Sequence, residues 1–240
     1  MSALSFERVT KTYVRSHLGR DYKSRGIEEL DLRVRPWEAF GLLGLNGSGK
    51  TTTFKLALGL LRPTTGQVRV LGQNPEDPRA SARVGFLPEL PYFYPFLTPR
   101  ETLAFYGRLS GLDGAGLRER VEKVLGQVGL TAAGGRKLGE FSKGMVQRVG
   151  LAQALIHEPD LLILDEPVSG LDPLAIKEFR DLLFTLNESG KTLVVSSHSI
   201  SEIERLCHRV GILKEGRLVR VLEQKEWAKG LEDLFVETVR

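Results

Sequence analysis

The sequence has few features that would place the chain outside the cell or anchor it in a bilayer. It contains a single cysteine, Cys207, which excludes an internal disulfide and suits a reducing compartment. No stretch approaches the run of about 18 apolar residues that spans a membrane. Residues 1–8 lack the basic and apolar regions of a secretory signal. We therefore expect a cytoplasmic protein, which would need a separate subunit to act across a membrane.

A strong charge bias, internal repeats and low-complexity tracts are also missing. The formal net charge is only +4, which is too small to predict nucleic-acid binding without a basic patch, so no nucleic-acid partner is expected. The apolar and charged fractions, 41% and 27%, are ordinary for a globular protein. With 240 residues the chain can bury a large core, as one domain or as a domain with a subdomain.

The most specific pattern in the chain is the segment Gly44–Thr51. It reads Gly-Leu-Asn-Gly-Ser-Gly-Lys-Thr and matches the phosphate-loop pattern G-x-x-x-x-G-K-[ST]. Its glycines allow a tight turn that points backbone N–H groups at one anion. The apolar run Ala39–Leu43 predicts a strand before it, and helical spacing predicts a helix from Thr51 to Leu61. Phosphates would then lie at a helix N-terminus, with Lys50 on the β- and γ-phosphates and Thr51 on Mg²⁺.

In the rest of the chain, the hydrophobic pattern predicts strands that alternate with helices. Strands are predicted at 3–9, 30–34, 66–71, 84–87, 161–164 and 192–195, and a hairpin at 210–222 turning at Glu215-Gly216. Helices are predicted over much of 99–156, from Pro173 with Asp172 as N-cap, and after a capping box of Ser199 and Glu202. The polar segment Val14–Gly26 is interpreted as an exposed loop, either solvated or touching a partner or lipid. This alternation predicts an α/β fold with a mainly parallel sheet and an inserted helical subdomain.

Two adjacent carboxylates follow the continuously apolar strand 161–164. Asp165 and Glu166 would lie at the carboxyl edge of the parallel sheet, where open α/β sheets bind ligands. In a phosphoryl-transfer site, Asp165 would hold Mg²⁺ and Glu166 would orient and deprotonate the attacking water. The alternative is a strand end with two solvated acids, which the nearby phosphate-loop pattern makes less favourable.

These motifs, taken in order, make the chain resemble the nucleotide-binding subunit of an ATP-binding cassette (ABC) transporter over most of its length. Five further segments carry the resemblance: the family signature in Phe141–Met145, the magnesium and catalytic motif in Leu162–Pro167, the following D-loop in Ser169–Pro173, the switch histidine His198, and the aromatic residue Tyr13. The signature differs from Leu-Ser-Gly-Gly-Gln at three of five positions but keeps Ser142 and Gly144.

The resemblance implies a P-loop NTPase (RecA-like) core with an N-terminal antiparallel β subdomain and a helical subdomain. The single domain, 1–240, would divide into a core of 1–88 with 156–240 and a helical signature subdomain, 89–155. The implied nucleotide-binding residues are Tyr13, Asn46, Gly47, Ser48, Gly49, Lys50, Thr51 and Thr52, together with Ser142 and Gly144 acting across a dimer. The implied metal-site residues are Thr51, Glu89 and Asp165, and the implied catalytic residues are Glu166 and His198. Glu89 stands where the family usually has glutamine, so it adds charge and cannot donate an amide N–H.

The resemblance further implies ATP hydrolysis with Mg²⁺, powering transport through a separate transmembrane permease. The chain would pair with itself or with a similar ATPase chain, and would sit on the inner face of the cell membrane. The segment Tyr92–Pro99, together with the altered signature, most resembles the export-type branch. The longer aromatic and proline-rich stretch Phe86–Pro99 would either dock on the permease or pack the subdomain join. Two alternatives stay open: a non-transport ABC ATPase, and a regulatory nucleotide-binding module that hydrolyses poorly.

Overall fold

The computed structural model describes residues 2–17, 20–227 and 230–239. The chain divides into two compact units. The first consists of Met1–Ser81 with Thr192–Arg240, and the second of Ala82–Lys191. The predicted division into 1–88 with 156–240 and 89–155 has different boundaries, and it stays a prediction.

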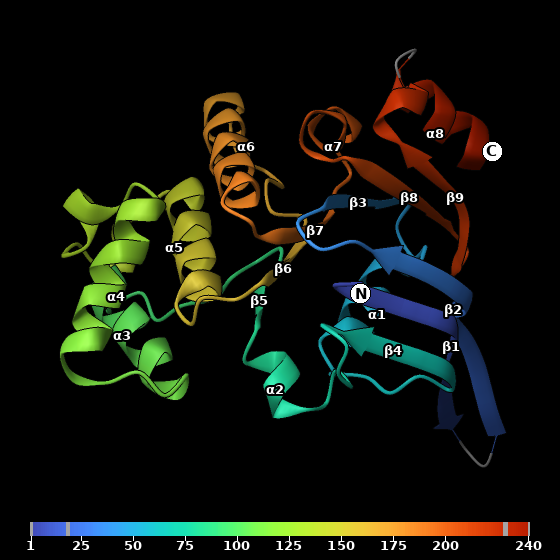
Figure 1. Ribbon diagram of the computed structural model, residues 1–240, viewed down its shortest axis with the longest axis horizontal. Coiled ribbons are helices and arrows are strands. Elements are labelled where there is room, and N and C mark those ends of the chain that lie inside the picture. Colours follow the sequence, from blue (N-terminus) through green and yellow to red (C-terminus); the bar gives the residue numbers. More distant parts are fainter. Residues whose placement is uncertain (1, 18–19, 228–229, 240) are drawn as a thin grey trace. The chain divides into compact units, whose positions relative to one another are not determined.

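The first unit contains an antiparallel sheet of three strands in the order β2-β1-β4 (Figure 1). The strands are β1 (Leu4–His17), β2 (Arg20–Val34) and β4 (Thr65–Val70). Alternate side chains face the core, because successive residues of a strand point to opposite faces. They include Leu4, Phe6, Leu30, Leu32, Val34, Val68 and Val70, all buried. The predicted antiparallel subdomain is confirmed.

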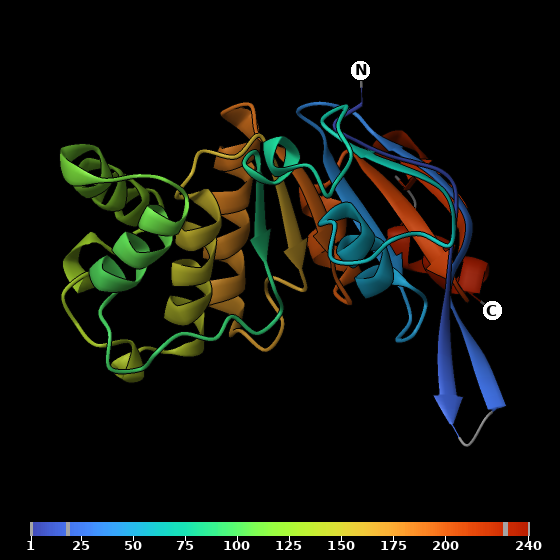
Figure 2. The same ribbon diagram turned by 90° about the horizontal axis from the view of Figure 1, so that it is seen from below.

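The interpretation of Val14–Gly26 as a loop is wrong for residues 14–17 and 20–26, while residues 18–19 lie outside the described part of the chain. Strands β1 and β2 continue through it as a paired ribbon that reaches beyond the sheet (Figure 2), with Val14 opposite Lys23 and Tyr13 opposite Ser24. Val14 is 54% exposed and Tyr22 is 57% exposed, so no core lies against the ribbon at these positions. A strand with solvent on both faces has no need for alternating apolar residues, and main-chain pairing leaves no trace in the hydrophobic pattern.

A second sheet in the first unit carries the strand before the phosphate loop. Strand β3 (Ala39–Gly44) lies between β7 (Thr192–Ser196) and β8 (Arg209–Lys214), is parallel to both, and is buried throughout. Strand β9 (Arg217–Glu223) joins β8 in the predicted hairpin. Glu215 and Gly216 both have positive φ, 50° and 82°, as a tight hairpin turn requires. The remaining elements of this unit are α1 (Lys50–Ala57), α2 (Pro78–Ser81), α7 (Ile200–Leu206), η3 (Gln224–Trp227) and α8 (Leu231–Val239).

Two helix-end predictions in this unit are wrong. Helix α1 ends at Ala57 rather than Leu61, because Gly59 adopts φ +68° and the amides of Gly59 and Leu60 turn back to the carbonyls of Leu56 and Lys55. This bonding closes the helix in a Schellman motif. The capping box before α7 does not form, since Ser199 makes no side-chain cap and its Oγ lies 3.3 Å from the Oγ of Ser201.

The second unit pairs β5 (Val84–Leu87) with β6 (Leu161–Asp165) in parallel. Its helices are α3 (Pro99–Leu109), α4 (Gly114–Gln127), α5 (Lys143–Leu155) and α6 (Pro173–Glu188), with the 3₁₀ turns η1 (Thr131–Ala133) and η2 (Leu138–Glu140). Leu117, Val121, Val124 and Leu125 of α4 recur at helical spacing and are buried. Asp172 caps α6 as predicted, by accepting a hydrogen bond from Ala175 N at 2.9 Å. Within the described residues, no helix is both long and apolar enough to cross a bilayer.

Candidate functional site

The phosphate-loop segment forms a tight turn between β3 and α1. Ser48 N donates to Leu45 O at 3.1 Å, and Gly47 and Gly49 have φ values of +78° and +111°. A Cβ on Gly44 would collide with the Ser48 side chain and the Leu213 carbonyl. Glycine is therefore required at these positions for backbone conformation or for space, as the sequence pattern predicts.

Lys50 folds back along this turn. Its Nζ donates to Gly44 O at 2.6 Å and lies 3.5 Å from Leu45 O, and the residue is only 7% exposed. The first amide bonded within α1 is that of Thr53, which donates to Gly49 O at 2.9 Å. The preceding amides, Lys50 to Thr52, therefore lie at the helix end where intrahelical acceptors are absent. No acidic residue occupies the first turn of α1, so its positive end is not neutralised from within the helix.

Two glycines outside the motif support the turn, and sequence reasoning missed their role. Gly216 N donates to Ser48 O at 2.9 Å, and Gly216 O accepts from Glu28 N at 2.7 Å. A Cβ on Gly49 would lie 2.9 Å from Gly26 O, so β2 also approaches the loop closely. Gly216 was visible in the sequence only as a hairpin turn, and Gly26 only as the end of a polar segment.

Tyr13 lies on β1 beside the first turn of α1. Its hydroxyl is 3.1 Å from Thr52 Oγ1, and Lys11 Nζ lies 5.8 Å from its ring centroid. A Cβ on Gly26 would lie 2.7 Å from Tyr13 Cε2, so only glycine leaves room for the ring. The aromatic residue is half-buried and lies next to the N-terminal end of the helix.

His198 leaves the same sheet edge as the phosphate loop. It follows β7, whose Ser196 is opposite Leu42 of the parallel strand β3, so both loops begin at the carboxyl ends of neighbouring strands. His198 is exposed, and the backbone beside it is fixed by a hydrogen bond from Ser199 N to Ser197 Oγ at 3.0 Å. In the first unit, His198 and the phosphate loop therefore leave the same edge of the sheet, and Tyr13 lies beside the first turn of α1.

The second unit brings the acidic residues together in the same way. Asp165 ends β6 and Glu166 follows it, while Glu89 follows the parallel neighbour β5 through Pro88. Glu166 is only 6% exposed and adopts φ +47°, an uncommon conformation for a residue with a side chain. Glu89 is exposed and its Oε1 accepts a hydrogen bond from Ser169 Oγ at 3.4 Å. In the described residues, no group of three or more His, Cys, Asp or Glu side chains could hold a metal ion by itself.

The signature segment Phe141–Met145 contains the start of α5. Ser142 caps the helix by accepting a hydrogen bond from Met145 N at 3.3 Å. Ser142 is exposed and Gly144 is half-buried. A hollow of about 390 Å³ lies beside them, lined also by the start of α6 and the segment before it. The exposed cap leaves this helix N-terminus open to an anion.

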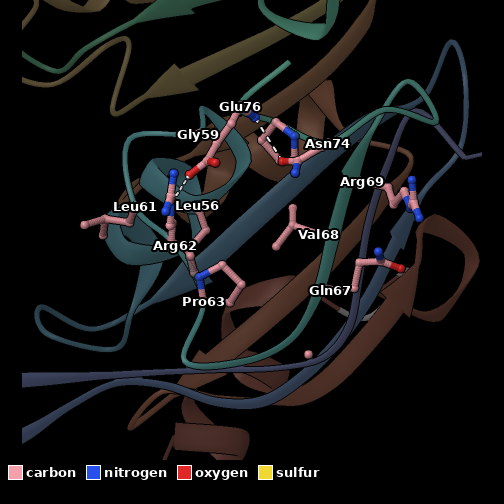
Figure 3. A pocket seen from close by; sticks show the side chains of 12 residues that line it. Leu56, Gly59, Leu61, Arg62, Pro63, Gln67, Val68, Arg69, Asn74 and Glu76 are labelled. Atoms are coloured by element: carbon pink, nitrogen blue, oxygen red, sulfur yellow. Dashed lines mark hydrogen bonds and ion pairs between the residues drawn. The ribbon is translucent and has the colours of Figure 1, made fainter.

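The first unit also contains a hollow, and it is not lined by any of the predicted site residues. It measures about 310 Å³ and lies where α1 ends, beside β4 (Figure 3). Leu56, Pro63 and Val68 give it an apolar lining, and Arg62 Nε pairs with Glu76 Oε1 at 2.5 Å. None of the predicted site residues lines it, and the phosphate-loop residues lie at the opposite end of α1.

Comparison with known proteins agrees with the motifs. The family model described as ABC transporter matches residues 27–169. The chain is 42% identical over 198 residues to the bacitracin transport ATP-binding protein BcrA of Bacillus licheniformis, covering 81% of this chain and 64% of that one. It is 39% identical over 220 residues to the Nod factor export ATP-binding protein I of Paraburkholderia xenovorans, covering 91% and 70%.

A solved structure shares both fold and family. It is an ATP-binding cassette in a dimeric, post-hydrolysis state bound to ADP and Pi, with a TM-score of 0.81, 26% identity and coverage of 92% of this chain and 98% of that one. The chain spans 58% to 64% of the length of three curated relatives that it matches. The likeness to this structure confirms the predicted P-loop NTPase fold. On the matched domain and the identities of these relatives, the chain belongs to the ABC transporter family of ATP-binding proteins.

Proposed function

We propose that the chain binds ATP with Mg²⁺ and hydrolyses it, and that this powers transport through a separate transmembrane permease. The observation that carries the proposal is the phosphate loop. The buried Lys50 and the first backbone amides of α1 lie at a turn that needs glycine for its conformation and space. Such a turn concentrates hydrogen-bond donors and positive charge where a polyphosphate would lie.

The nucleotide would be held mainly by the first unit. Lys50 supplies a fixed positive charge to the β- and γ-phosphates, and the loop residues Asn46–Gly49 with Thr52 supply backbone and hydroxyl groups. Tyr13 offers its ring to the adenine base. Thr51, Asp165 and Glu89 offer the oxygen ligands that Mg²⁺ prefers, and bound Mg²⁺ would neutralise charge on the phosphates.

Glu166 would act as the general base. Its buried carboxylate at the end of β6 can accept the proton of an attacking water, and His198 would position the γ-phosphate. Burial strengthens the electrostatic interactions of this carboxylate with its surroundings. Its restricted backbone at φ +47° limits where the carboxylate can lie.

The complete site would be shared between two chains. Ser142 and Gly144 at the exposed start of α5 would bind the γ-phosphate held by the partner's phosphate loop. The partner would be a second copy or a similar ATPase chain, and the dimeric cassette bound to ADP and Pi supports this arrangement. The segment 89–155 would then be the signature subdomain of a single ATPase domain.

We propose export as the direction of transport, and the inner face of the cell membrane as the location. The name of one relative, a Nod factor export ATP-binding protein, supports the direction, and that of a bacitracin transport ATP-binding protein supports a role in transport. The permease would dock on the stretch Phe86–Pro99. Tyr92, Tyr94 and Phe96 are 84%, 58% and 64% exposed there, which is unusual for aromatic side chains on a surface without a partner.

Steady-state ATP turnover of the chain tests the enzymatic part. Lys50→Ala should abolish ATP binding or turnover, because it removes the fixed charge at the phosphates. Lys177→Ala, an exposed lysine on α6, is the matched control and should behave as wild type. Normal turnover in Lys50→Ala would overturn the proposal. ATP binding without turnover in the wild-type chain, even with a permease present, would favour the regulatory module instead.

A further inference from the structure

The loop after β6 is a compact structure in which Glu166 is linked to the residues that follow it. Ser169 N donates to Glu166 O at 3.1 Å, and Leu171 N donates to Val168 O at 3.3 Å. Glu166 and Gly170 both have positive φ, +47° and +66°. The two turns overlap, so the backbone of Glu166 is hydrogen-bonded to the segment that contains Ser169 and Gly170.

Glu89 contacts one side of this loop. Its Oε1 accepts the hydrogen bond from Ser169 Oγ at 3.4 Å. The contact arises because β5 and β6 are parallel neighbours, so the segments after Leu87 and after Asp165 leave the same edge. An ionised carboxylate can only accept hydrogen bonds, so the direction of this bond is fixed, with the serine as donor.

Lys143 contacts the next residue of the loop. A Cβ on Gly170 would collide with Lys143 Nζ and would lie 3.6 Å from its Cε and 4.0 Å from its Cδ. The end of the lysine side chain therefore lies against the bare Cα of Gly170. Within the described part of the chain, Lys143 forms no ion pair. Glycine at position 170 is needed both for its φ and for this contact.

The packing of α5 against α6 fixes the start of α5, and with it the position of Lys143 beside Gly170. A Cβ on Gly144 would lie 3.4 Å from Ala175 Cβ, so the first turns of α5 and α6 are in close approach. One turn further on, Arg148 pairs with Glu178 at 2.5 Å. Lys143 also lies at a helix N-terminus, where a cation is unfavourable, and no acidic residue in the first turn compensates it.

Glu89 and Lys143 both differ from the residues that the family usually has at these positions. In the structure they contact two consecutive residues of one loop, Ser169 and Gly170. We propose that they are positioning residues that hold Ser169–Gly170 from two sides and so fix Glu166 for proton transfer. This inference rests on the proposed function, because it assigns Glu166 the role of base. Neither residue needs to touch the reacting atoms to act in this way.

The test uses the full-length chain and three variants of these contacts. Ser169→Ala removes the hydroxyl while leaving the Glu89 carboxylate intact, and Ser169→Thr restores a hydroxyl. Lys143→Met keeps the length of the side chain but removes the ammonium group. Lys177→Met, at an exposed position of α6, is the matched control. The measurements are kcat and KM for ATP, together with the midpoint of thermal unfolding.

We expect Ser169→Ala and Lys143→Met each to lower kcat roughly tenfold, less than the 10²-fold that a 1 Å misplacement can cost. KM should change less than about twofold, and Ser169→Thr should stay close to wild type. The double variant Ser169→Ala/Lys143→Met should also lose only about tenfold, because both changes release the same loop. The unfolding midpoints should match that of Lys177→Met.

Three results would overturn the inference. One is wild-type kcat in both single variants. Another is a loss of about a hundredfold in the double variant, which would show that Lys143 and Ser169 act independently. The third is a loss of kcat with a lowered unfolding midpoint and no rescue by Ser169→Thr. Glu166→Gln separates these from failure of the proposed function: if it turns over ATP like wild type, the base assignment itself is wrong.

Discussion

The hydroxyl of Tyr13 lies 3.1 Å from Oγ1 of Thr52, so this contact joins strand β1 to the first turn of α1. The two residues are far apart in sequence, and Gly26 makes the approach possible by leaving room for the tyrosine ring. An aromatic face is thereby fixed beside the phosphate loop, at a position where a base attached to the bound phosphates would lie in the proposed complex.

Replacing Tyr13 tests this placement. Tyr13→Ala should weaken ATP binding by roughly 1–3 kcal/mol, the range for a base stacked on an aromatic ring. Tyr13→Phe keeps the ring and should bind almost normally, although it loses the hydrogen bond to Thr52. Tyr22→Ala, on the exposed ribbon, is the control. Isothermal titration with a non-hydrolysable ATP analogue measures all three. Equal damage from Ala and Phe would show that the hydroxyl matters rather than the ring.

Glu166→Gln should trap a nucleotide-bound dimer. Glutamine keeps the shape of the side chain but cannot take a proton, so turnover should fall by about 10²–10⁴ while ATP binding survives. Because ATP would bridge two chains, size-exclusion chromatography should show a dimer with ATP and a monomer without it. Adding Ser142→Arg should abolish the dimer and spare binding. A Glu166→Gln chain that binds ATP and stays monomeric would contradict the shared-site model for the isolated chain.

The part of the β1–β2 ribbon beyond the pair Val14 and Lys23 should contribute little to the free energy of unfolding. Val14 and Lys23 are opposite each other, so residues 15–22 can be replaced by Asn-Gly, which favours a two-residue hairpin turn. Tyr22, which this change removes, is exposed, and changes at exposed surface positions typically alter the free energy of unfolding by less than about 0.5 kcal/mol. Urea unfolding of the shortened chain measures the change. A loss above about 2 kcal/mol would show that the ribbon is part of the core.

Variants in the stretch Phe86–Pro99 can distinguish side chains that dock on a permease from side chains that pack inside the chain. Tyr92 and Tyr94 are exposed, whereas Phe93 is half-buried and packs edge-on against Tyr106 with ring centroids 6.2 Å apart. Tyr92→Ser and Tyr94→Ser should leave the thermal midpoint unchanged and reduce the fraction of the chain bound to membranes of its own cells. Phe93→Ala should lower the midpoint. Unchanged membrane binding in both tyrosine variants would count against this stretch as the docking surface.

His157 should make the stability of the second unit depend on pH. Burial lowers the pKa of its imidazole, with help from Arg120 and Lys191, and Nε2 donates to Val84 O at 3.0 Å. Because the folded pKa is below the ordinary value near 6.5, the stabilisation is present above about pH 6.5 and is lost as pH falls through the folded pKa. The slope should be at most about 1.4 kcal/mol per pH unit. Unfolding of His157→Gln between pH 7.5 and 5 should lack this component, and an identical slope in both chains would refute it.

The hydrophobic pattern determined much of the fold because it reports burial, and burial is what holds these elements in place. The run 161–164 became a fully buried strand, and the phosphate-loop pattern formed its turn where the sequence placed it. Asp172 and Ser142 cap the helices they precede, since a cap needs only a side chain and an amide three residues away. These features are local, so a single stretch of sequence contains all the groups that form them.

Other features depend on contacts between distant segments, which a local sequence pattern does not encode. The ribbon around Val14 and Tyr22 has no apolar alternation because these side chains are exposed rather than packed on a core, and only its pairing made it a strand. Gly26 and Gly216 support the phosphate loop through backbone contacts that leave no sequence signature. The contacts of Glu89 and Lys143 with Ser169–Gly170 join residues from three separate segments. Such contacts exist only after parallel strands align and helix ends approach, because hydrogen bonds and close packing act over a few ångströms in space, whatever the separation along the chain.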